Sequence, residues 1–477
     1  MPEPRDFPVL KIEGEQDSLL DPYRHACYAL RRDVVDPGDE SALKAPALRG
    51  LNQAFADAWD AAIGSLGLRW AGIGTRSVTD AFLAGLDNAG FLPAKLEYAG
   101  GGNPPEEPPP RRIAAPLFAF AEWEHFRLHG NRERLEHAFA LLHTDFLYRE
   151  DHLRKRNGLL AGAPEPYRLH ATARFMLGGR VVPSLAGGAS WVDASSIYAL
   201  NARLLGEIAR ALGRKEEAGE FEWALRDLAS RVNALMWDDG DNWYHDLDEH
   251  GARLPMKTLA GLWAVLSGVA PRNRAELMLK RLSDPTQFER AHPFATVSAA
   301  EGDYRKRDGA PVGVARPDFN LLAFEALFAL HRFGDAQRAC EAHLRRVAKV
   351  LKDSGEMFLA YDPDRDIPAP LHDGSSGANA PLAHAACIHN SLGVLMGLRP
   401  HANRGELELV PHLEQRHSIE GLRFAFGTIN MEVGPADKTG ARRTIELMCD
   451  VPFKLRVRRG DKSQLHDLHP GMHTLQA

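Results

Sequence analysis

The sequence has few of the features that mark secreted, membrane-spanning or zinc-binding proteins. Only four of its 477 residues are cysteine, and Cys27, Cys340, Cys387 and Cys449 lie far apart without a CxxC pair. We therefore expect four reduced, mostly buried thiols, with no structural zinc and no other metal or cofactor. The start "MPEPRDFPVLKIEGEQD" is acidic and is not a secretory signal. No apolar run approaches the roughly 20 residues that span a bilayer.

An excess of positive charge is also absent. The chain has 58 basic and 64 acidic residues, a net charge of −6, and no basic block that would bind nucleic acid. Its 44% hydrophobic and 26% charged residues are typical of a soluble globular protein. We therefore expect a cytoplasmic protein with neither nucleic acid nor a membrane as its partner.

Helical periodicity dominates the chain up to about residue 404. An apolar helix, a glycine turn and a charged amphipathic helix recur three times, with turns at Gly130, Gly213 and Gly334. Helix pairs joined by tight turns, with irregular loops between the pairs, predict an α/α toroid. The run "GGGNPPEEPPPRR" (100–112) is too rich in Pro and Gly to be helical, and is either a spacer or a long loop at the mouth of the barrel.

The tail of the chain has a different period. In "LRFAFGTINMEV" (422–433), apolar residues alternate on both sides of "GT", which predicts a hairpin. Further strands are expected in "RTIELMCDVPFKLRVRRGDK". We therefore predict an N-terminal helical segment with a Pro/Gly-rich loop over 1–112, a barrel over 113–404 and a small β-module over 405–477.

Three strings give the barrel a family resemblance. They are "WVDASSIYALNARLLGEIARALGRKEEA" (191–218), "LMWDDGDNWYHDLDEHGARLPMKTLAGLWAVLSGVA" (235–270) and "FERAHPFATVSA" (288–299). Together they resemble glycoside hydrolase families 63 and 37, the α-glucosidase, mannosylglycerate-hydrolase and trehalase-like enzymes. The resemblance implies a mainly α fold, an (α/α)6 toroid with the small C-terminal β-module added, and a carbohydrate substrate.

The residues at the pocket depart from that family. Gly178, Gly179 or Arg180 stands where the resemblance places the general acid, and Leu359 stands where it places the base. Arg316 replaces a Trp, and His384 lies near the position of another. The nearest substitute carboxylates are Asp193, which is either a helix cap or a catalytic group, and Glu356 and Asp362, which are either turn residues or bases.

Two other kinds of residue point to the same pocket. His384 and His389 are candidates for an acid–base pair because imidazole titrates near neutrality. Arg180 and Arg316 fit a carboxylate or phosphate on the substrate, or else form salt bridges within the protein.

The loop "WDDGDNWYHDLDEHG" (237–251) lacks the ligand order of an EF-hand, and we interpret it as hairpin-like. The full set of candidate substrate-binding residues is Trp123, Arg180, Trp191, Tyr244, Lys257, Arg316, Asp318 and Tyr361.

Three functions remain open at this point. The first is a carbohydrate-active enzyme, similar to inverting glycoside hydrolases, that acts on a small glycoside, either anionic or neutral. The second is a lyase or isomerase that works through histidine and carboxylate side chains. The third is a sugar-binding barrel without catalysis.

Overall fold

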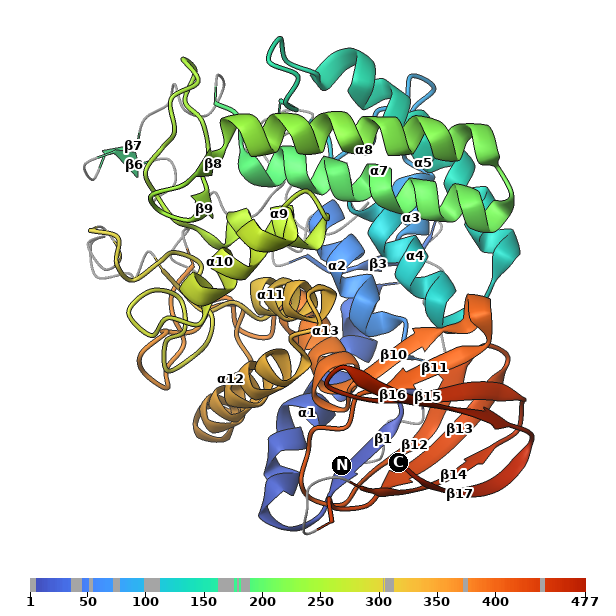
Figure 1. Cartoon of the computed structure of the whole chain (residues 1–477). Coiled ribbons are helices and arrows are strands. Elements are labelled where there is room, and N and C mark those ends of the chain that lie inside the picture. The colour runs from blue at the N-terminus through green and yellow to red at the C-terminus, as the bar shows by residue number, and fades with distance from the viewer. Residues whose placement is uncertain are drawn as a thin grey trace.

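The computed structural model describes residues 6–35, 45–50, 55–71, 78–97, 112–161, 176–177, 180–181, 189–302, 304, 313–371, 376–437 and 442–477. A helical body is followed by a β-module at the C-terminal end of the chain, as Figure 1 shows. Most of the run predicted as a spacer at 100–112 lies outside the described residues.

Within the described residues, six helices contact one another in a closed ring. Each contacts the next along the chain, and the last contacts the first. In order they are α2 (Ala58–Leu68), α4 (Phe118–His129), α7 (Val192–Leu212), α9 (Leu262–Leu266), α11 (Pro317–Ala329) and α13 (Pro381–His389). Every residue of α13 is buried, because a helix that is apolar on all sides belongs in the centre of a large protein. We call these six the inner helices.

The ring closes between α2 and α13 at a glycine. A Cβ atom added to Gly67 would lie 2.1 Å from the backbone oxygen of Ala385. No side chain fits at that separation, so only glycine lets the two helices approach this closely. Gly67 therefore determines the spacing at which the ring closes.

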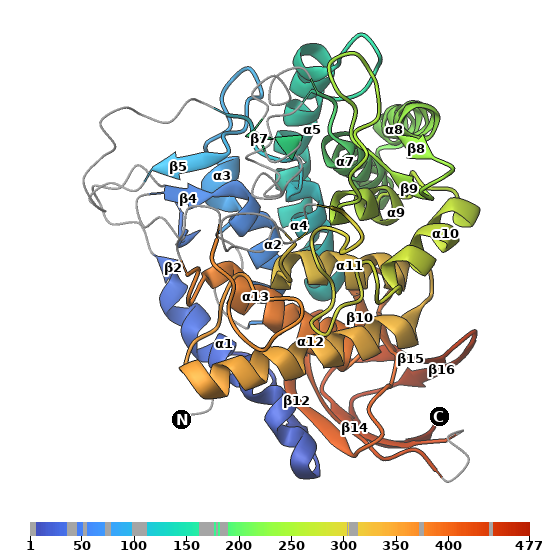
Figure 2. The ribbon, with the colours of Figure 1, turned by 90° about the vertical axis from the view of Figure 1, so that its left-hand side faces the viewer.

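A second set of helices covers the ring. α5 (Arg132–Leu153) contacts α4 and α7, and α8 (Lys215–Leu235) contacts α7. α1 (Asp21–Asp33) and α12 (Phe333–Ser354) lie side by side next to α13 (Figure 2). These helices are amphipathic: α12 buries Ala336, Cys340, Leu344 and Val347 at helical spacing. The shorter helical elements are α3 (Asp80–Leu83), α10 (Arg272–Leu282), η1 (Gly14–Leu20), η5 (Leu259–Gly261), η6 (Asn390–Leu395) and η7 (Ala402–Arg404).

Two of the three predicted glycine turns are confirmed. Gly130 and Gly213 follow α4 and α7 with φ of 70° and 82°. The prediction for Gly334 is wrong, because this glycine lies inside the first turn of α12. The turn between α11 and α12 is made instead by His331, which has φ of 60° and donates its backbone N–H to Phe328 O.

The β-module consists of two main sheets. The five-stranded sheet has the order β1-β12-β13-β14-β17, and the four-stranded sheet the order β10-β11-β15-β16. The strands are β1 (Val9–Ile12), β10 (Leu398–His401), β11 (Glu406–Leu409), β12 (His417–Phe424), β13 (Gly427–Val433), β14 (Thr444–Cys449), β15 (Phe453–Arg459), β16 (Lys462–Leu468) and β17 (Gly471–Gln476). The predicted hairpin is confirmed by the pairing of β12 with β13. Since β1 and β10 belong to these sheets, strands from before residue 405 also take part, and the three domain boundaries remain predictions.

The remaining strands form short pairs around the helical body. They are β2 (Val34–Val35) with β3 (Ala47–Leu48), β4 (Phe55–Asp57) with β5 (Lys95–Glu97), β6 (Met176–Leu177) with β7 (Arg180–Val181), and β8 (Trp237–Asp238) with β9 (Trp243–Tyr244). The last pair confirms the hairpin predicted in 237–251. All four cysteines are described, and all are buried and free of disulfides, as predicted.

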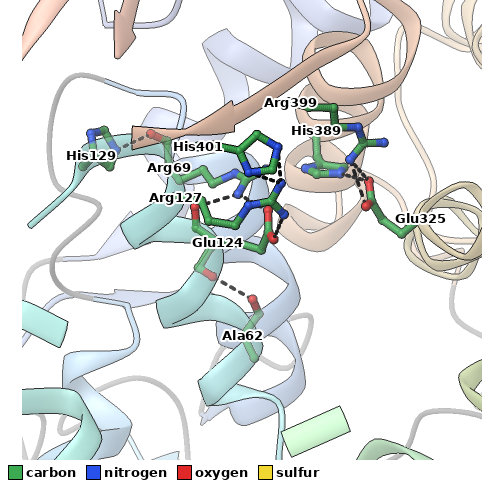
Figure 3. Close-up of polar contacts among 10 residues, drawn as sticks. Ala62, Arg69, Glu124, Arg127, His129, Glu325, His389, Arg399 and His401 are labelled. Carbon is green, nitrogen blue, oxygen red and sulfur yellow. Dashed lines mark hydrogen bonds and ion pairs between the residues drawn. The ribbon is translucent and has the colours of Figure 1, made fainter. Parts of the chain in front are cut away.

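Charged side chains join the inner helices to strand β10 in two groups, drawn in Figure 3. In the first, Glu124 of α4 accepts hydrogen bonds of 2.5 Å from both Arg69 and Arg127, and Arg127 also contacts His401. In the second, Glu325 of α11 accepts from Arg399 at 2.8 Å and contacts the His389 ring at 2.9 Å. Burial alone would raise the pKa of Glu325, but Arg399 and His389 lower it to about 2.

The glycine at the ring closure can be tested by substitution. We expect Gly67→Ala to lower the free energy of unfolding by about 1–3 kcal/mol or more, because the added Cβ forces α2 away from α13. Gly219→Ala is the matched control: it lies in α8, where an added Cβ would have open space, so it should stabilise the protein by about 0.5–1 kcal/mol. Urea unfolding followed by circular dichroism measures both. Equal effects of the two substitutions would contradict the close approach.

Two buried histidines make a second prediction, about pH. His292 Nε2 lies 2.7 Å from His343 Nδ1, and Asn320 contacts the same Nδ1 at 3.3 Å. Burial lowers the pKa of His343 to about 3 and that of His292 well below its usual range. Unfolded histidine titrates near 6.5, so the unfolded chain binds more protons as the pH falls below that value.

We therefore expect full stability above about pH 6.5, and a loss of about 1.4 kcal/mol per pH unit for each of the two histidines at lower pH. Urea unfolding at a series of pH values from 7.5 downward measures the slope. His343→Gln should reduce it, whereas His250→Gln, at an exposed site, should not. A slope that His343→Gln leaves unchanged would show that other groups carry the pH dependence.

Candidate functional site

The loops that enter α9, α11 and α13 are fixed to one another by backbone bridges. Residues 295–297 bridge Thr258, which precedes α9, and Ala315, which precedes α11. Ala315 also exchanges two hydrogen bonds of 2.9 Å with Tyr361, in the loop that leads to α13. The amino-terminal ends of these three inner helices therefore lie at one end of the ring, which we call the mouth.

A buried polar contact at the mouth joins α2 to α11. Arg316 donates to both carboxylate oxygens of Asp318, at 3.0 and 2.8 Å, and Trp59 Nε1 donates to Asp318 Oδ2 at 3.3 Å. The Trp59 ring stacks on Phe319 at 5.8 Å and meets Trp263 edge-on at 6.0 Å. Of the two interpretations of Arg316, the structure gives the salt bridge, and Asp318 is the partner. Both carboxylate oxygens of Asp318 are therefore engaged.

Asp193 lies inside the first turn of α7. The residue that caps the helix is Trp191, and the backbone N–H of Val192 donates to the side chain of Asp246 at 2.8 Å. The interpretation of Asp193 as the helix cap is therefore wrong, because Asp246 bonds the free N–H instead. Asp193 accepts from Ala194 N at 2.9 Å, and the helix amino terminus favours its negative charge.

Three inner helices share this feature of a buried aspartate in the first turn. Asp60 of α2, Asp193 of α7 and Asp318 of α11 expose 5%, 1% and 0% of their surface. Asp60 is not among the residues predicted from the sequence, although the string "AWDAAIG" places an aspartate beside a tryptophan at a helix start much as "WVDAS" does. A first-turn carboxylate at a converging set of helix ends can act as a base or bind a hydroxyl group of a substrate.

No carboxylate residue stands at the positions where the resemblance places the general acid and the base. Leu359, at the base position, is 4% exposed and belongs to the hydrophobic core. Gly178 and Gly179 lie outside the described residues, and only the backbone of Arg180 is described, in β7. The described part of the chain therefore has an apolar side chain where the base is expected.

The two substitutes near Leu359 are turn residues. Glu356 follows the end of α12 and accepts from Asn379 Nδ2 at 3.2 Å. Asp362 accepts from the backbone N–H groups of Asp364 and Arg365, at 2.9 and 3.0 Å, and pairs with the Arg365 side chain. These contacts favour the interpretation of Glu356 and Asp362 as turn residues, and a catalytic role for either one stays a prediction.

Most of the other predicted binding residues pack within the protein. Tyr361 is buried, and its hydroxyl accepts from Phe358 N at 2.9 Å. Trp191 is buried beside α7, and Trp123 is partly buried against the core.

The remaining two lie near the 237–251 loop. Tyr244 is buried and donates to Asn233 at 2.5 Å, and burial raises its pKa to about 12. Lys257 contacts Asp241 and Glu301, both at 3.1 Å; these two carboxylates raise its pKa against the opposing effect of burial.

The two candidate histidines contact different carboxylates. His384 Nδ1 lies 3.0 Å from Asp33 Oδ2 of α1, whereas His389 Nε2 lies 2.9 Å from Glu325 Oε1 of α11. His389 is the last residue of α13 and belongs to the group that contacts β10, away from the mouth (Figure 3). The two rings therefore contact different helices, and a catalytic role for His384 and His389 stays a prediction.

No group of three or more His, Cys, Asp or Glu side chains within the described ranges is arranged to hold a metal ion. A search of the same residues finds no helix that is both long and apolar enough to cross a membrane.

Comparison with solved structures gives the fold independently. The GH63 mannosylglycerate hydrolase from Thermus thermophilus aligns over 77% of this chain and 98% of its own, with 17% identity and a TM-score of 0.59. The neutral trehalase Nth1 from Saccharomyces cerevisiae aligns over 77% and 79%, with 13% identity and a TM-score of 0.54. A protein described as a sialidase aligns over 99% of this chain and 40% of its own, with 13% identity and a TM-score of 0.67. At these identities the likeness establishes the fold alone.

Comparison with known sequences finds one curated relative and one family model that match parts of the chain. A curated protein of Borreliella burgdorferi, described as uncharacterized, is 26% identical over 261 residues. The match covers 54% of this chain and 53% of that relative, about half the length of each. Residues 185–365 match the profile described as the mannosylglycerate hydrolase MGH1-like glycoside hydrolase domain. The resemblance indicated by the three sequence strings is thereby confirmed, since residues 185–365 match an MGH1-like glycoside hydrolase domain.

Proposed function

We propose that this protein is a carbohydrate-active enzyme of the (α/α)6-toroid type, which hydrolyses a small glycoside at the mouth of the ring. The observation that carries the proposal is the set of first-turn aspartates, Asp60, Asp193 and Asp318, on inner helices of a glycoside hydrolase fold. Glycoside hydrolysis needs carboxyl groups at the scissile bond, and these are the buried carboxylates that the inner helices present in their first turns.

Asp193 is the catalytic carboxylate in this proposal. It lies within residues 185–365, the segment that matches the family model, and its side chain is withdrawn from bulk water. Asp318 is a weaker candidate, because Arg316 and Trp59 occupy both of its oxygens. An inverting mechanism needs a second carboxyl group about 6.5–9.5 Å away, to protonate the leaving oxygen or to activate water. Asp60 is the candidate for that second role.

The substrate class that we propose is a small glycoside, with anionic glycosides included. The mannosylglycerate hydrolase from Thermus thermophilus has been solved with Tris and D-glycerate, which is an anion. Arg316 places a buried guanidinium at the mouth, and a guanidinium binds carboxylate oxygens through its planar fork. A carboxylate on the substrate would compete with Asp318 for that fork.

A second candidate function is carbohydrate binding without catalysis. The observation that favours it is the apolar Leu359 at the expected base position, together with the engagement of both Asp318 oxygens. A lyase or isomerase that uses His384 and His389 has no comparable support, because the two rings contact different carboxylates on different helices.

Product analysis by NMR separates these functions. We expect the full-length protein, incubated with pooled small glycosides that include glycerate-, uronate- and phosphate-bearing ones, to release an anomerically inverted sugar. Asp193→Asn should lower the rate by at least about a hundredfold, because the amide can neither accept nor deliver the proton. Glu356→Gln is the matched control and should keep the activity, since Glu356 only accepts a hydrogen bond from Asn379.

Two results would contradict the hydrolase. An unsaturated or epimerised product would indicate the lyase or isomerase. No turnover, combined with a rise in melting temperature on adding one of the glycosides, would indicate the binding protein. Activity that is lost in Glu356→Gln and kept in Asp193→Asn would place the catalytic group in the loop after α12.

A further inference from the structure

Two arginines of the β-module lie close enough for their positive charges to interact. Arg443 directly precedes β14, and Arg459 is the last residue of β15. Arg443 exposes only 7% of its surface, and its Nη1 donates to the backbone oxygens of Leu413 and Gly434, at 2.5 and 3.2 Å. Backbone carbonyls satisfy hydrogen bonds of Arg443, but they do not neutralise its charge.

The tip of Arg459 is covered and has no partner among the described residues. Its Nη1 and Nη2 atoms are buried, and neither forms a hydrogen bond there. Within the same part of the chain, no carboxylate forms an ion pair with Arg443 or Arg459. By contrast, Arg456 and Arg458 on the same strand pair with Glu406 and Glu408 of β11. Arg459 therefore differs from Arg456 and Arg458, which each pair with a glutamate of β11.

Neighbouring groups act on the two guanidinium charges in opposite directions. Burial lowers the pKa of Arg443, and the positive charge of Arg459 lowers it further. The negative charge of Glu414 raises it. Burial also lowers the pKa of Arg459, whereas the negative charge of Asp437 raises it. Burial and the positive charge of Arg443 lower the pKa of the buried His417 to about 4, so this histidine adds no third positive charge at neutral pH.

Buried charges in proteins are normally paired, because removing an ion from water costs several kcal/mol. The positive charges of Arg443 and Arg459 also repel each other, which adds to that cost. Guanidinium groups bind oxyanions through parallel N–H donors, and the Nη1 and Nη2 donors of Arg459 form no hydrogen bond within the described residues. We propose that Arg443 and Arg459 form a binding site for a small oxyanion, the phosphate, sulfate or carboxylate group of a ligand. The site does not depend on the function proposed for the mouth.

Thermal unfolding of the full chain tests the site. In wild-type protein we expect inorganic phosphate to raise the melting temperature in a saturable manner, beyond the effect of sodium chloride at the same ionic strength. Arg459→Gln should abolish that rise. Without phosphate it should unfold at the same temperature as the wild type or higher, because the repulsion with Arg443 is removed. Arg459→Lys keeps the charge but lacks the planar fork, so it should need about tenfold more phosphate.

Arg458→Gln is the matched control, because it alters the neighbouring residue, which pairs with Glu408, and should keep the full response to phosphate. Sulfate and glucuronate, titrated in the same way, distinguish an inorganic anion from the carboxylate of a sugar. An Arg459-dependent rise with any of the three anions supports the site. Equal effects of phosphate and sodium chloride on the wild type, or a phosphate response that survives in Arg459→Gln, would overturn it.

Discussion

The contact of α2 with α13 is the constraint on which the rest of the structure depends. The inner helices are apolar on nearly every side, so each needs two neighbours within the ring as well as a covering helix outside it. Gly67 allows the last of these contacts to form, because its missing Cβ leaves room for the Ala385 backbone oxygen.

The two ends use charge in different ways. At the mouth, aspartates occupy first turns, where helix amino termini favour negative charge, and Arg316 pairs with one of them. At the other end, Glu124 and Glu325 are each held by arginine, and β10 supplies two members of these groups, Arg399 and His401. The first arrangement places carboxylates near the entry loops, whereas the second fastens the β-module to the ring. This difference is why we place the chemistry at the mouth.

Local patterns in the sequence predicted local structure well. The hairpin at 422–433, the turns at Gly130 and Gly213 and the family of the 185–365 segment all follow from residues close together in the chain. Contacts between distant segments could not be predicted in this way: Glu124 meets Arg69, and Glu325 meets Arg399 across 74 residues. One signal was present, since a lone glutamate in an apolar helix such as "NLLAFEALFAL" must find a cation. The roles of Asp193 and Glu356 likewise depended on neighbours that the sequence does not reveal.

The pairing of β1 with β12 has a consequence for how the chain folds during synthesis. Lys11 and Glu420, which form an ion pair across these two strands, are 409 residues apart in the chain. A ribosome therefore releases the first strand long before its partner exists, and β1 has an unpaired edge until the last part of the chain has emerged. Contacts of such long range slow folding and leave edges open to association with other chains. Assembly of this protein is accordingly completed only when both of these distant segments are present.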